Sequence, residues 1–418
     1  MALAIATFLI ALALIASERV HRTKVALLGA AVVILFVGDY NEELAIHSIE
    51  FATLGLLAGM MILVYLTQQS GIYDFIAVKA GQFSRGDPFR LVVMMVIVVA
   101  VLSGFLDNLT TILLVVPITF LLADTLDINP MPLLLIEVMA ANIGGAATLI
   151  GDPPNIMIGD VAGLSFNDFL INNLPGVYVI LGVVTVGLYL AFRKQIQVAD
   201  ENRKYVMELD AAASIRDRNE LKRTMPVLIG TIILFFLHQY IHIEPATVAL
   251  TGAAVALMVT RIPIEEALEK IEWTTLFFFM GLFVMVGALE VTGAIGKLAE
   301  GITSVTQGDR NAELVGIIWT SSLVGGIVDN IPLTAAMIPV VEDIQGNSAD
   351  NAYWWALSLG ACFGGNLTLI SAACNVAAAG MAERAGQPIG FWQFLKVGFP
   401  VTLATTMMAT AYILLRYG

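Results

Sequence analysis

The chain has 418 residues, of which 58% are hydrophobic and only 13% are charged, and its formal net charge is −13. Soluble domains carry roughly 45–50% apolar and about 25% charged residues. This composition excludes an ordinary soluble protein, a disordered chain and a nucleic-acid-binding protein. The two cysteines, Cys362 and Cys374, form neither a disulfide framework nor a zinc motif. The class indicated is a polytopic α-helical membrane protein.

Apolar segments long enough to cross a bilayer recur along the chain. A helix needs about 20 apolar residues to cross roughly 30 Å of hydrocarbon. The sequence predicts spans near residues 2–18, 24–38, 51–68, 174–192, 226–241, 247–260, 273–291 and 395–415. Four further apolar stretches, at 89–123, 132–163, 310–345 and 352–384, are interrupted by polar, Gly and Pro residues. We expect the first span to be a retained helix, because no basic segment precedes it as in a signal peptide.

The basic residues predict the orientation. The segment 193–223 holds eight of the 21 Lys and Arg residues, and the positive-inside rule places it in the cytoplasm. The loop 19–24 then also lies inside and the acidic loop 39–50 outside, provided that 89–123 and 310–345 are re-entrant hairpins. The expectation is ten crossings of a bacterial or archaeal inner membrane, with both termini outside.

The sequence contains an internal repeat. The segment 25–32 recurs at 248–255, and 104–108 recurs at 326–330, so that Asp107 and Asp329 lie 222 residues apart. The segment 144–155 matches 364–375 at an offset of 220. Because each half has an odd number of crossings, the second copy must be inverted. Inverted repeats with broken helices that meet at the bilayer midplane are typical of secondary transporters.

We therefore predict an all-α polytopic membrane protein of two inverted repeats with five crossings each. The first repeat, 1–192, has scaffold helices within 1–84, a re-entrant hairpin at 89–123, a broken helix at 132–163 and a helix at 174–192. A cytoplasmic linker at 193–223 leads to the second repeat, 224–418. Its parts are scaffold helices within 226–291, a hairpin at 310–345, a broken helix at 352–384 and a helix at 395–415.

The expected hairpins each carry an aspartate in their middle. An Asp in the apolar centre of a membrane costs at least about 2.5–3.5 kcal/mol, and the chain has this residue twice, at Asp107 and Asp329. Two interpretations remain open. The carboxylates cap the free amides of the next half-helix, or at least one of them binds a cation or carries a proton.

The expected broken helices supply the other candidate residues. Pro153 and Pro154 cannot continue a helix, and unwound backbone at membrane depth needs protein or water around it. The second copy has no prolines and has Ala372 where the first has Asp152. Proton coupling is assigned to Asp107, Asp329 and Asp152. The candidate substrate- or ion-binding residues are Asp107, Asn108, Thr110, Thr111, Asn142, Thr148, Asp152, Asn155, Asp329, Asn330, Thr334, Asn366, Thr368, Ser371 and Asn375.

Other polar residues receive plainer interpretations. Neither the Asp-Asn runs at Asp107 and Asp329 nor the segments 142–155 and 364–375 contain Arg or Lys, which favours neutral solutes or cations over strongly anionic substrates. Glu137 faces either the cavity or the hairpin interface. Cys362 and Cys374 are interpreted as small packing residues, and His238 and His242 as interfacial residues because a third ligand is missing. We expect no metal and no cofactor.

Two motifs carry a family resemblance. The D-N-L-T-T run at Asp107, the N-I-G-G-A-A-T-L-I-G-D-P-P-N run at Asn142 and their second-half copies resemble the ion transporter superfamily. The resemblance is strongest to its branch of arsenite permeases (ArsB), NhaD-type sodium/proton antiporters and the melanosomal P protein. It implies a scaffold and a transport domain in each protomer, and a homodimer. Dicarboxylate relatives carry S-N-T at each hairpin tip, where this chain has Asp-Asn, so dicarboxylate transport is disfavoured.

The leading hypothesis is a non-enzymatic permease that exports arsenite or antimonite in exchange for protons by alternating access. The alternative is an NhaD-type Na⁺/H⁺ antiporter, in which Asp107, Asp329 or Asp152 binds Na⁺. A permease for inorganic or organic anions and a passive channel are less favoured. An intramembrane aspartyl hydrolase is disfavoured because Leu149 stands where its G-x-G-D motif needs glycine. The lipid bilayer surrounds the chain, a soluble ATPase subunit is a candidate partner, and nucleic acid is not.

Overall fold

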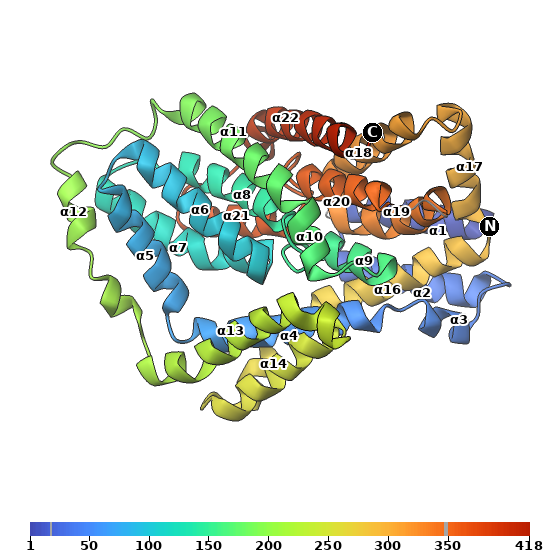
Figure 1. The fold of residues 1–418 in the computed structure, drawn as a ribbon, viewed down its shortest axis with the longest axis horizontal. Helices are drawn as coiled ribbons and strands as arrows, with labels where there is room; N and C mark the ends of the chain where they lie inside the picture. Colours follow the sequence, from blue (N-terminus) through green and yellow to red (C-terminus); the bar gives the residue numbers. More distant parts are fainter. Residues whose placement is uncertain (17–18, 347–349) are drawn as a thin grey trace.

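The computed structural model describes residues 1–16, 19–346 and 350–418 as helices joined by loops (Figure 1). The first half contains α1 (Ala2–Ala16), α2 (Arg22–Phe36), α3 (Glu42–His47), α4 (Phe51–Gln68), α5 (Ile72–Ser84), α6 (Pro88–Leu106), α7 (Asn108–Leu126), α8 (Met131–Gly145), α9 (Pro153–Ala162), α10 (Phe166–Asn172) and α11 (Leu174–Phe192). The region after α11 contains α12 (Arg203–Glu208) and a short 3-10 helix (Ala211–Ser214).

The second half has the same order of elements, except that no separate helix corresponds to α10 among the described residues. It contains α13 (Arg218–Ile241), α14 (Pro245–Val259), α15 (Ile264–Glu269), α16 (Trp273–Val291), α17 (Ala294–Thr306), α18 (Arg310–Val328), α19 (Asn330–Gln345), α20 (Ala352–Gly364), α21 (Ala373–Arg384) and α22 (Phe391–Tyr417). The all-helical fold expected from the sequence is confirmed.

Among the described residues, eight helices are long and apolar enough to cross a membrane: α4, α6, α7, α11, α13, α16, α18 and α22. Shorter apolar helices occur in α1, α8 and α14. The spans predicted at 51–68, 174–192 and 273–291 coincide with α4, α11 and α16. The helix predicted at 226–241 begins earlier, because Asp217 caps it by accepting hydrogen bonds from the amides of Asn219 (2.7 Å) and Glu220 (3.1 Å).

The sequence repeat is also a repeat of helices. Helices α5 and α17, which the hydropathy criterion did not single out, begin at Ile72 and Ala294, 222 residues apart. Helices α6 and α18 begin at Pro88 and Arg310 with the same offset. Helix α17 carries Lys297 and Glu300 among its apolar residues, so a search for purely apolar segments passes over it.

The four interrupted stretches form two helical hairpins and two broken helices. Asp107 alone joins α6 to α7, and Asp329 alone joins α18 to α19. Residues 146–152 separate α8 from α9, and residues 365–372 separate α20 from α21. Pro153 is the first residue of α9, a position at which the missing amide hydrogen is not needed. The predicted hairpin and broken helix of each half are therefore both present.

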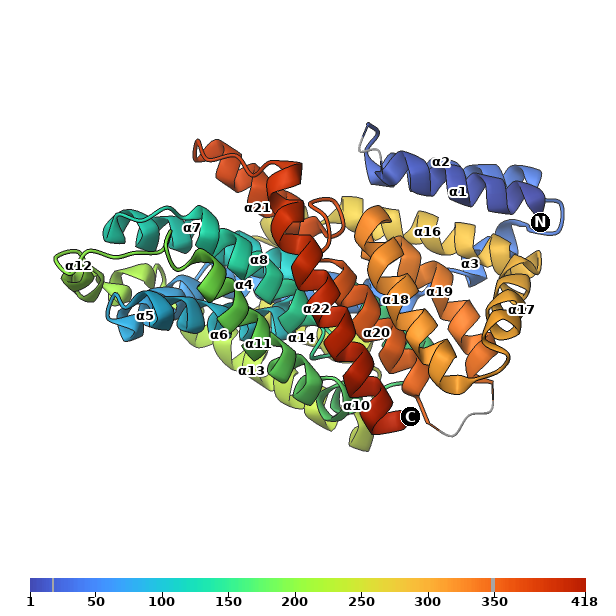
Figure 2. The same ribbon diagram turned by 90° about the horizontal axis from the view of Figure 1, so that it is seen from above.

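Helices from the two halves cross each other. Helix α2 packs against α16, and its repeat counterpart α14 packs against α4. Glycine allows the backbones to approach: a Cβ atom on Gly281 would lie 2.7 Å from the carbonyl carbon of Ala26, and one on Gly59 would lie 2.7 Å from that of Ala249. Figure 2 shows α1 and α2 on one side of the molecule and α13 on the opposite side. The two halves are thus interleaved.

Alanine in place of Gly59 or Gly281 is expected to lower the melting temperature, because overpacking against backbone typically costs about 1–3 kcal/mol. The matched control is Gly182→Ala in α11, where a new Cβ would meet nothing within 4 Å. There alanine is expected to be neutral or slightly stabilising. Thermal unfolding in detergent, followed by tryptophan fluorescence, measures all three. Equal melting temperatures for Gly59→Ala and Gly182→Ala would contradict the close packing.

Candidate functional site

Both hairpin tips have an unusual backbone. Asp107 has φ 106° and ψ 158°, and Asp329 has φ 148° and ψ 136°. Residues with a Cβ rarely adopt such angles, at a cost of order 1–3 kcal/mol each. Both side chains cap the following helix: Asp107 accepts a hydrogen bond from the Thr110 amide (2.8 Å), and Asp329 from the Ile331 amide (3.0 Å). Strained aspartates at equivalent positions indicate that their place is functionally constrained.

Each broken helix is tied to its own hairpin and closed by an asparagine. The Thr148 hydroxyl donates to the Gly104 carbonyl, and its counterpart Thr368 donates to the Gly326 carbonyl. The Asn155 amide donates to the Thr148 carbonyl at 2.9 Å, and the equivalent Asn375 amide donates to the Thr368 carbonyl at 2.9 Å. The unwound backbone therefore finds its hydrogen-bond partners within the protein.

A network of amides joins the two broken helices. The Asn142 side-chain nitrogen lies within hydrogen-bond distance of the Gly365 carbonyl (3.1 Å) and of the side-chain oxygens of Asn366 and Asn375 (3.0 Å each). The Asn108 amide donates to the Asn142 oxygen at 3.1 Å, which adds the first hairpin. These side chains are at most 5% exposed. The network holds one hairpin and two broken helices in one arrangement.

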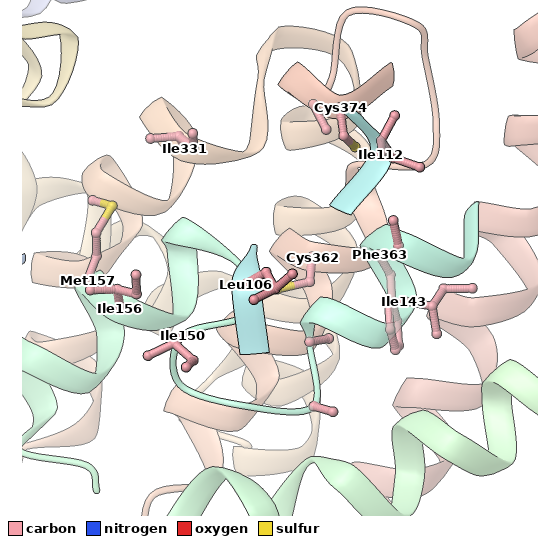
Figure 3. Packing of buried hydrophobic residues seen from close by; sticks show 14 of the residues in the cluster. Leu106, Ile112, Ile143, Ile150, Ile156, Met157, Ile331, Cys362, Phe363 and Cys374 are labelled. Atoms are coloured by element: carbon pink, nitrogen blue, oxygen red, sulfur yellow. The ribbon is translucent and has the colours of Figure 1, made fainter. Parts of the chain in front are cut away.

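Apolar side chains from the hairpins and broken helices pack against one another, and both cysteines belong to this packing (Figure 3). Cys362 and Cys374 are fully buried. The Cys374 thiol donates to the Asn142 oxygen at 3.0 Å, and the Cys362 thiol lies 3.5 Å from the Asn155 oxygen. Both thiols behave as small packing groups with polar neighbours, as the sequence led us to expect.

A cavity of about 40 Å³ lies between the hairpin tips and the broken helices. Its polar lining comprises Arg22, Asp107, Asn108, Asp152, Glu272, Thr275 and Asn330. Asp152 is only 1% exposed, and its Oδ2 atom is buried and has no hydrogen-bond partner among the described residues. The Nδ2 atom of Asn330 is likewise buried and has no hydrogen-bond partner among the described residues. We name this space the ion cavity.

Several helices begin at the ion cavity. Asn108, Pro153 and Asn330 are the first residues of α7, α9 and α19, and all three line it. Helix N-termini carry partial positive charge that stabilises a nearby carboxylate by typically about 0.3–1 kcal/mol. The fold thus directs backbone dipoles toward Asp107 and Asp152.

Four of the predicted site residues, Asp107, Asn108, Asp152 and Asn330, line the ion cavity. Asp329 lines an adjacent cavity of about 520 Å³. The remaining predicted residues are buried or half-buried outside these linings: Thr110, Thr111, Asn142, Thr148, Asn155, Thr334, Asn366, Thr368, Ser371 and Asn375. Most of their side chains form hydrogen bonds with backbone carbonyls. The Thr334 hydroxyl, for example, donates to the Asn330 carbonyl at 2.7 Å.

Two charged residues of the ion cavity, Arg22 and Glu272, were missed by sequence reasoning. Arg22 begins α2 and Glu272 immediately precedes α16, so both come from the crossed helices. Glu272 had a usable signal, because it repeats Glu50 at the start of a span. Arg22 gave none, because hydropathy places it in a connecting loop. The hairpin tips (104–111 and 326–334) and the unwound segments (142–155 and 364–375) do lack Arg and Lys, but the tertiary structure brings a guanidinium to them.

Glu137 lies at the hairpin interface. It is 1% exposed, and its two oxygens lie 2.8 and 2.7 Å from the Thr119 hydroxyl of α7. The repeat counterparts of Glu137 and Thr119 are Leu357 and Val341. This polar contact therefore belongs to the first hairpin alone.

A second large cavity, of about 420 Å³, lies near the start of α4 and is lined by Thr53, Asp160, His238 and Glu244 among others. The Thr53 hydroxyl donates to Asp160 at 3.1 Å. Burial and the neighbouring Asp160 carboxyl raise the pKa of Glu50, which precedes α4, to about 7. His238 accepts a hydrogen bond from the Phe166 amide (3.1 Å), and the described residues contain no metal-binding cluster of His, Cys, Asp and Glu.

These features define a membrane transporter, and comparison with known proteins assigns it to a family. The chain matches the family described as citrate transporter (CitMHS) over residues 12–360, and it belongs to that family. It is 42% identical to an uncharacterized transporter of Mycobacterium tuberculosis, over 99% of this chain and 98% of that protein. It is 34% identical to the mouse P protein, over 97% of this chain and 59% of that protein.

The fold is similar to that in the crystal structure of the Alcanivorax borkumensis YdaH transporter. The TM-score is 0.60 at 14% sequence identity, covering 88% of this chain and 86% of that one. The predicted membership of the ion transporter superfamily is confirmed.

The strained backbone of Asp107 predicts how substitutions at the first hairpin tip change thermal stability. The Asp107→Gly variant is expected to unfold at a higher temperature than the Asp107→Ala variant, because glycine tolerates φ 106°. Asp87 is the matched control, since it caps α6 in the same manner through the Arg90 amide (2.9 Å) but has φ −73°. The advantage of glycine over alanine should be larger at Asp107 than at Asp87 by about 1 kcal/mol or more. Equal advantages at the two positions would show that the tip is unstrained.

Proposed function

We propose that this protein is a secondary active transporter that exchanges a small cation, Na⁺ in the first instance, for protons at the ion cavity. The observation that carries the proposal is the Asp152 carboxylate, which is buried, faces the cavity and has an oxygen without a hydrogen-bond partner among the described residues. A buried carboxylate in this condition requires a proton or a cation.

The charge balance around the ion cavity supports a positively charged ligand. Asp107, Asp152 and Glu272 line the cavity, whereas Arg22 is its one basic lining residue and is paired with Asp329. Helix N-termini supply only partial compensation, since each contributes about 0.3–1 kcal/mol. The remaining negative charge is neutralised most directly by bound protons or by a bound cation.

The size of the cavity also favours a small ion. One water molecule needs roughly 10–15 Å³ of cavity volume. The ion cavity, at about 40 Å³, therefore accommodates a few waters or one partly hydrated cation. A tricarboxylate such as citrate is much larger than this space in the present conformation. Asp107, Asp152 and Glu272 would also repel it.

Arsenite or antimonite efflux, the leading hypothesis from the sequence, has less support at this cavity. A soft metalloid would be expected to bind thiols. Cys362 and Cys374, however, are fully buried, and their thiols are hydrogen-bonded to asparagine oxygens. Arsenite is therefore retained as a comparison substrate in the transport assay.

The arrangement of helices supports alternating access. The wall of the ion cavity is shared between the hairpins and broken helices on one side and α2, α4 and α16 on the other. Movement of the first group past the second would expose the cavity to each side of the membrane in turn. Cation and proton would compete for Asp107 and Asp152, so either ligand neutralises the cavity before the movement.

The test uses purified protein in liposomes that contain a pH-sensitive dye. A Na⁺ gradient is expected to drive proton movement, and Asp107→Asn and Asp152→Asn are each expected to lower its rate by about tenfold or more. Asp124→Asn is the matched control, because Asp124 is exposed in the same helix as Asn108. Parallel measurements use K⁺, arsenite and citrate gradients. Proton movement driven by arsenite or citrate but not by Na⁺, or an Asp152→Asn rate equal to that of the unsubstituted protein, would overturn the proposal.

A further inference from the structure

The two equivalent hairpin aspartates receive hydrogen bonds from different donors. Both oxygens of Asp107 are bonded to Thr110, one to its amide at 2.8 Å and the other to its hydroxyl at 2.7 Å. The equivalent of Thr110 in the second hairpin is Pro332, which has neither an amide hydrogen nor a hydroxyl. Asp329 keeps one backbone donor, the Ile331 amide at 3.0 Å, and this donor serves Oδ1 only.

Arg22 supplies the missing donor. Its Nη1 lies 3.3 Å from Oδ2 of Asp329, whose side chain is only 6% exposed. The guanidinium carbon also lies 5.1 Å from the centroid of the Phe278 ring in α16, a cation–π contact that holds the arginine in place. The repeat counterparts of Arg22 and Phe278 are Pro245 and Leu56. Neither of these contacts can therefore be formed by the corresponding residues of the other half.

Arg22 stands between two cavities. It lines the ion cavity together with Asp107 and Glu272, and it also lines the adjacent cavity of about 520 Å³ together with Asp329. Its charge thus borders three carboxylates, but its ion pair is with Asp329. This places a fixed positive charge where a transported cation would otherwise be needed.

We infer that Arg22 is a resident counter-cation for Asp329 and thereby a positioning residue of the ion site. The inference rests on the proposed function. A buried carboxylate that loses its partner takes up a proton or a cation instead. Arg22 therefore removes one of the two hairpin aspartates from exchange with solution and leaves Asp107, together with Asp152, to the transported ion.

The test compares Arg22→Gln, Asp329→Asn and the double variant in the Na⁺-driven assay. Arg22→Gln frees Asp329 to bind an ion of its own, so the Na⁺ dependence should become steeper and its midpoint should shift by about fivefold or more. Asp329→Asn leaves Arg22 free to face Asp107 and Glu272 and should raise the midpoint by a similar factor. The double variant removes both charges, and its midpoint and steepness should return to within about twofold of the original values.

Two controls separate this role from general damage. Lys24→Gln removes an exposed charge from the same helix and should leave the Na⁺ dependence unchanged. Arg22→Lys keeps a positive charge and should retain most of the original behaviour. If Arg22→Gln does not fold, the double variant should nevertheless be recovered folded, because the unpaired buried charge is gone.

Thermal unfolding without any ion gradient distinguishes failure of this inference from failure of the proposed function. The melting-temperature losses of Arg22→Gln and Asp329→Asn should be markedly non-additive in the double variant, whether or not Na⁺ is transported. If Na⁺ drives no proton movement in the unsubstituted protein, the proposed function fails while this pairing is still measured. Additive losses, or an unchanged Na⁺ dependence in Arg22→Gln, would overturn the role of Arg22.

Discussion

A carboxylate buried in the interior of a membrane protein must be neutralised, and the centre of this structure follows from that requirement. Helix N-termini point at Asp107 and Asp152, the Thr110 hydroxyl donates a hydrogen bond to Asp107, and an arginine pairs with Asp329. What these contacts leave unsatisfied is an oxygen of Asp152 beside a cavity of about 40 Å³. A site with excess negative charge and little space is suited to a proton or a small cation.

The polar network next to the ion cavity gives it a defined shape. The amide of Asn142 reaches the second broken helix, and Asn155 and Asn375 close the unwound turns in the same manner in both halves. Buried polar groups are costly when unpaired and rigid when paired. The network therefore keeps the first hairpin and both broken helices together as one unit. The crossed helices approach closely at Gly281 (α2 with α16) and at Gly59 (α4 with α14), and the Thr23 hydroxyl of α2 also donates to the Thr274 carbonyl of α16 at 2.7 Å.

The repeat makes the framework symmetric, and individual substitutions make the chemistry asymmetric. In the alignment of the two halves, Asp152 corresponds to Ala372, and Thr110 corresponds to Pro332. Glu137 has Leu357 as its counterpart. Two equal half-sites would bind equal ligands, whereas here one half presents free carboxylate and the other is neutralised from within the protein.

The sequence by itself determined the helical class, the repeat, the hairpins and the broken helices, because hydropathy, Gly and Pro positions and internal similarity are local properties of the chain. It also identified Asp107, Asp152 and Asn330, since polar residues in apolar segments are conspicuous. Only the tertiary structure decided that most of the predicted asparagines and threonines form hydrogen bonds with backbone carbonyls. It alone also brought Arg22 and Glu272 to the cavity, because contacts between helices hundreds of residues apart depend on how the two halves interleave.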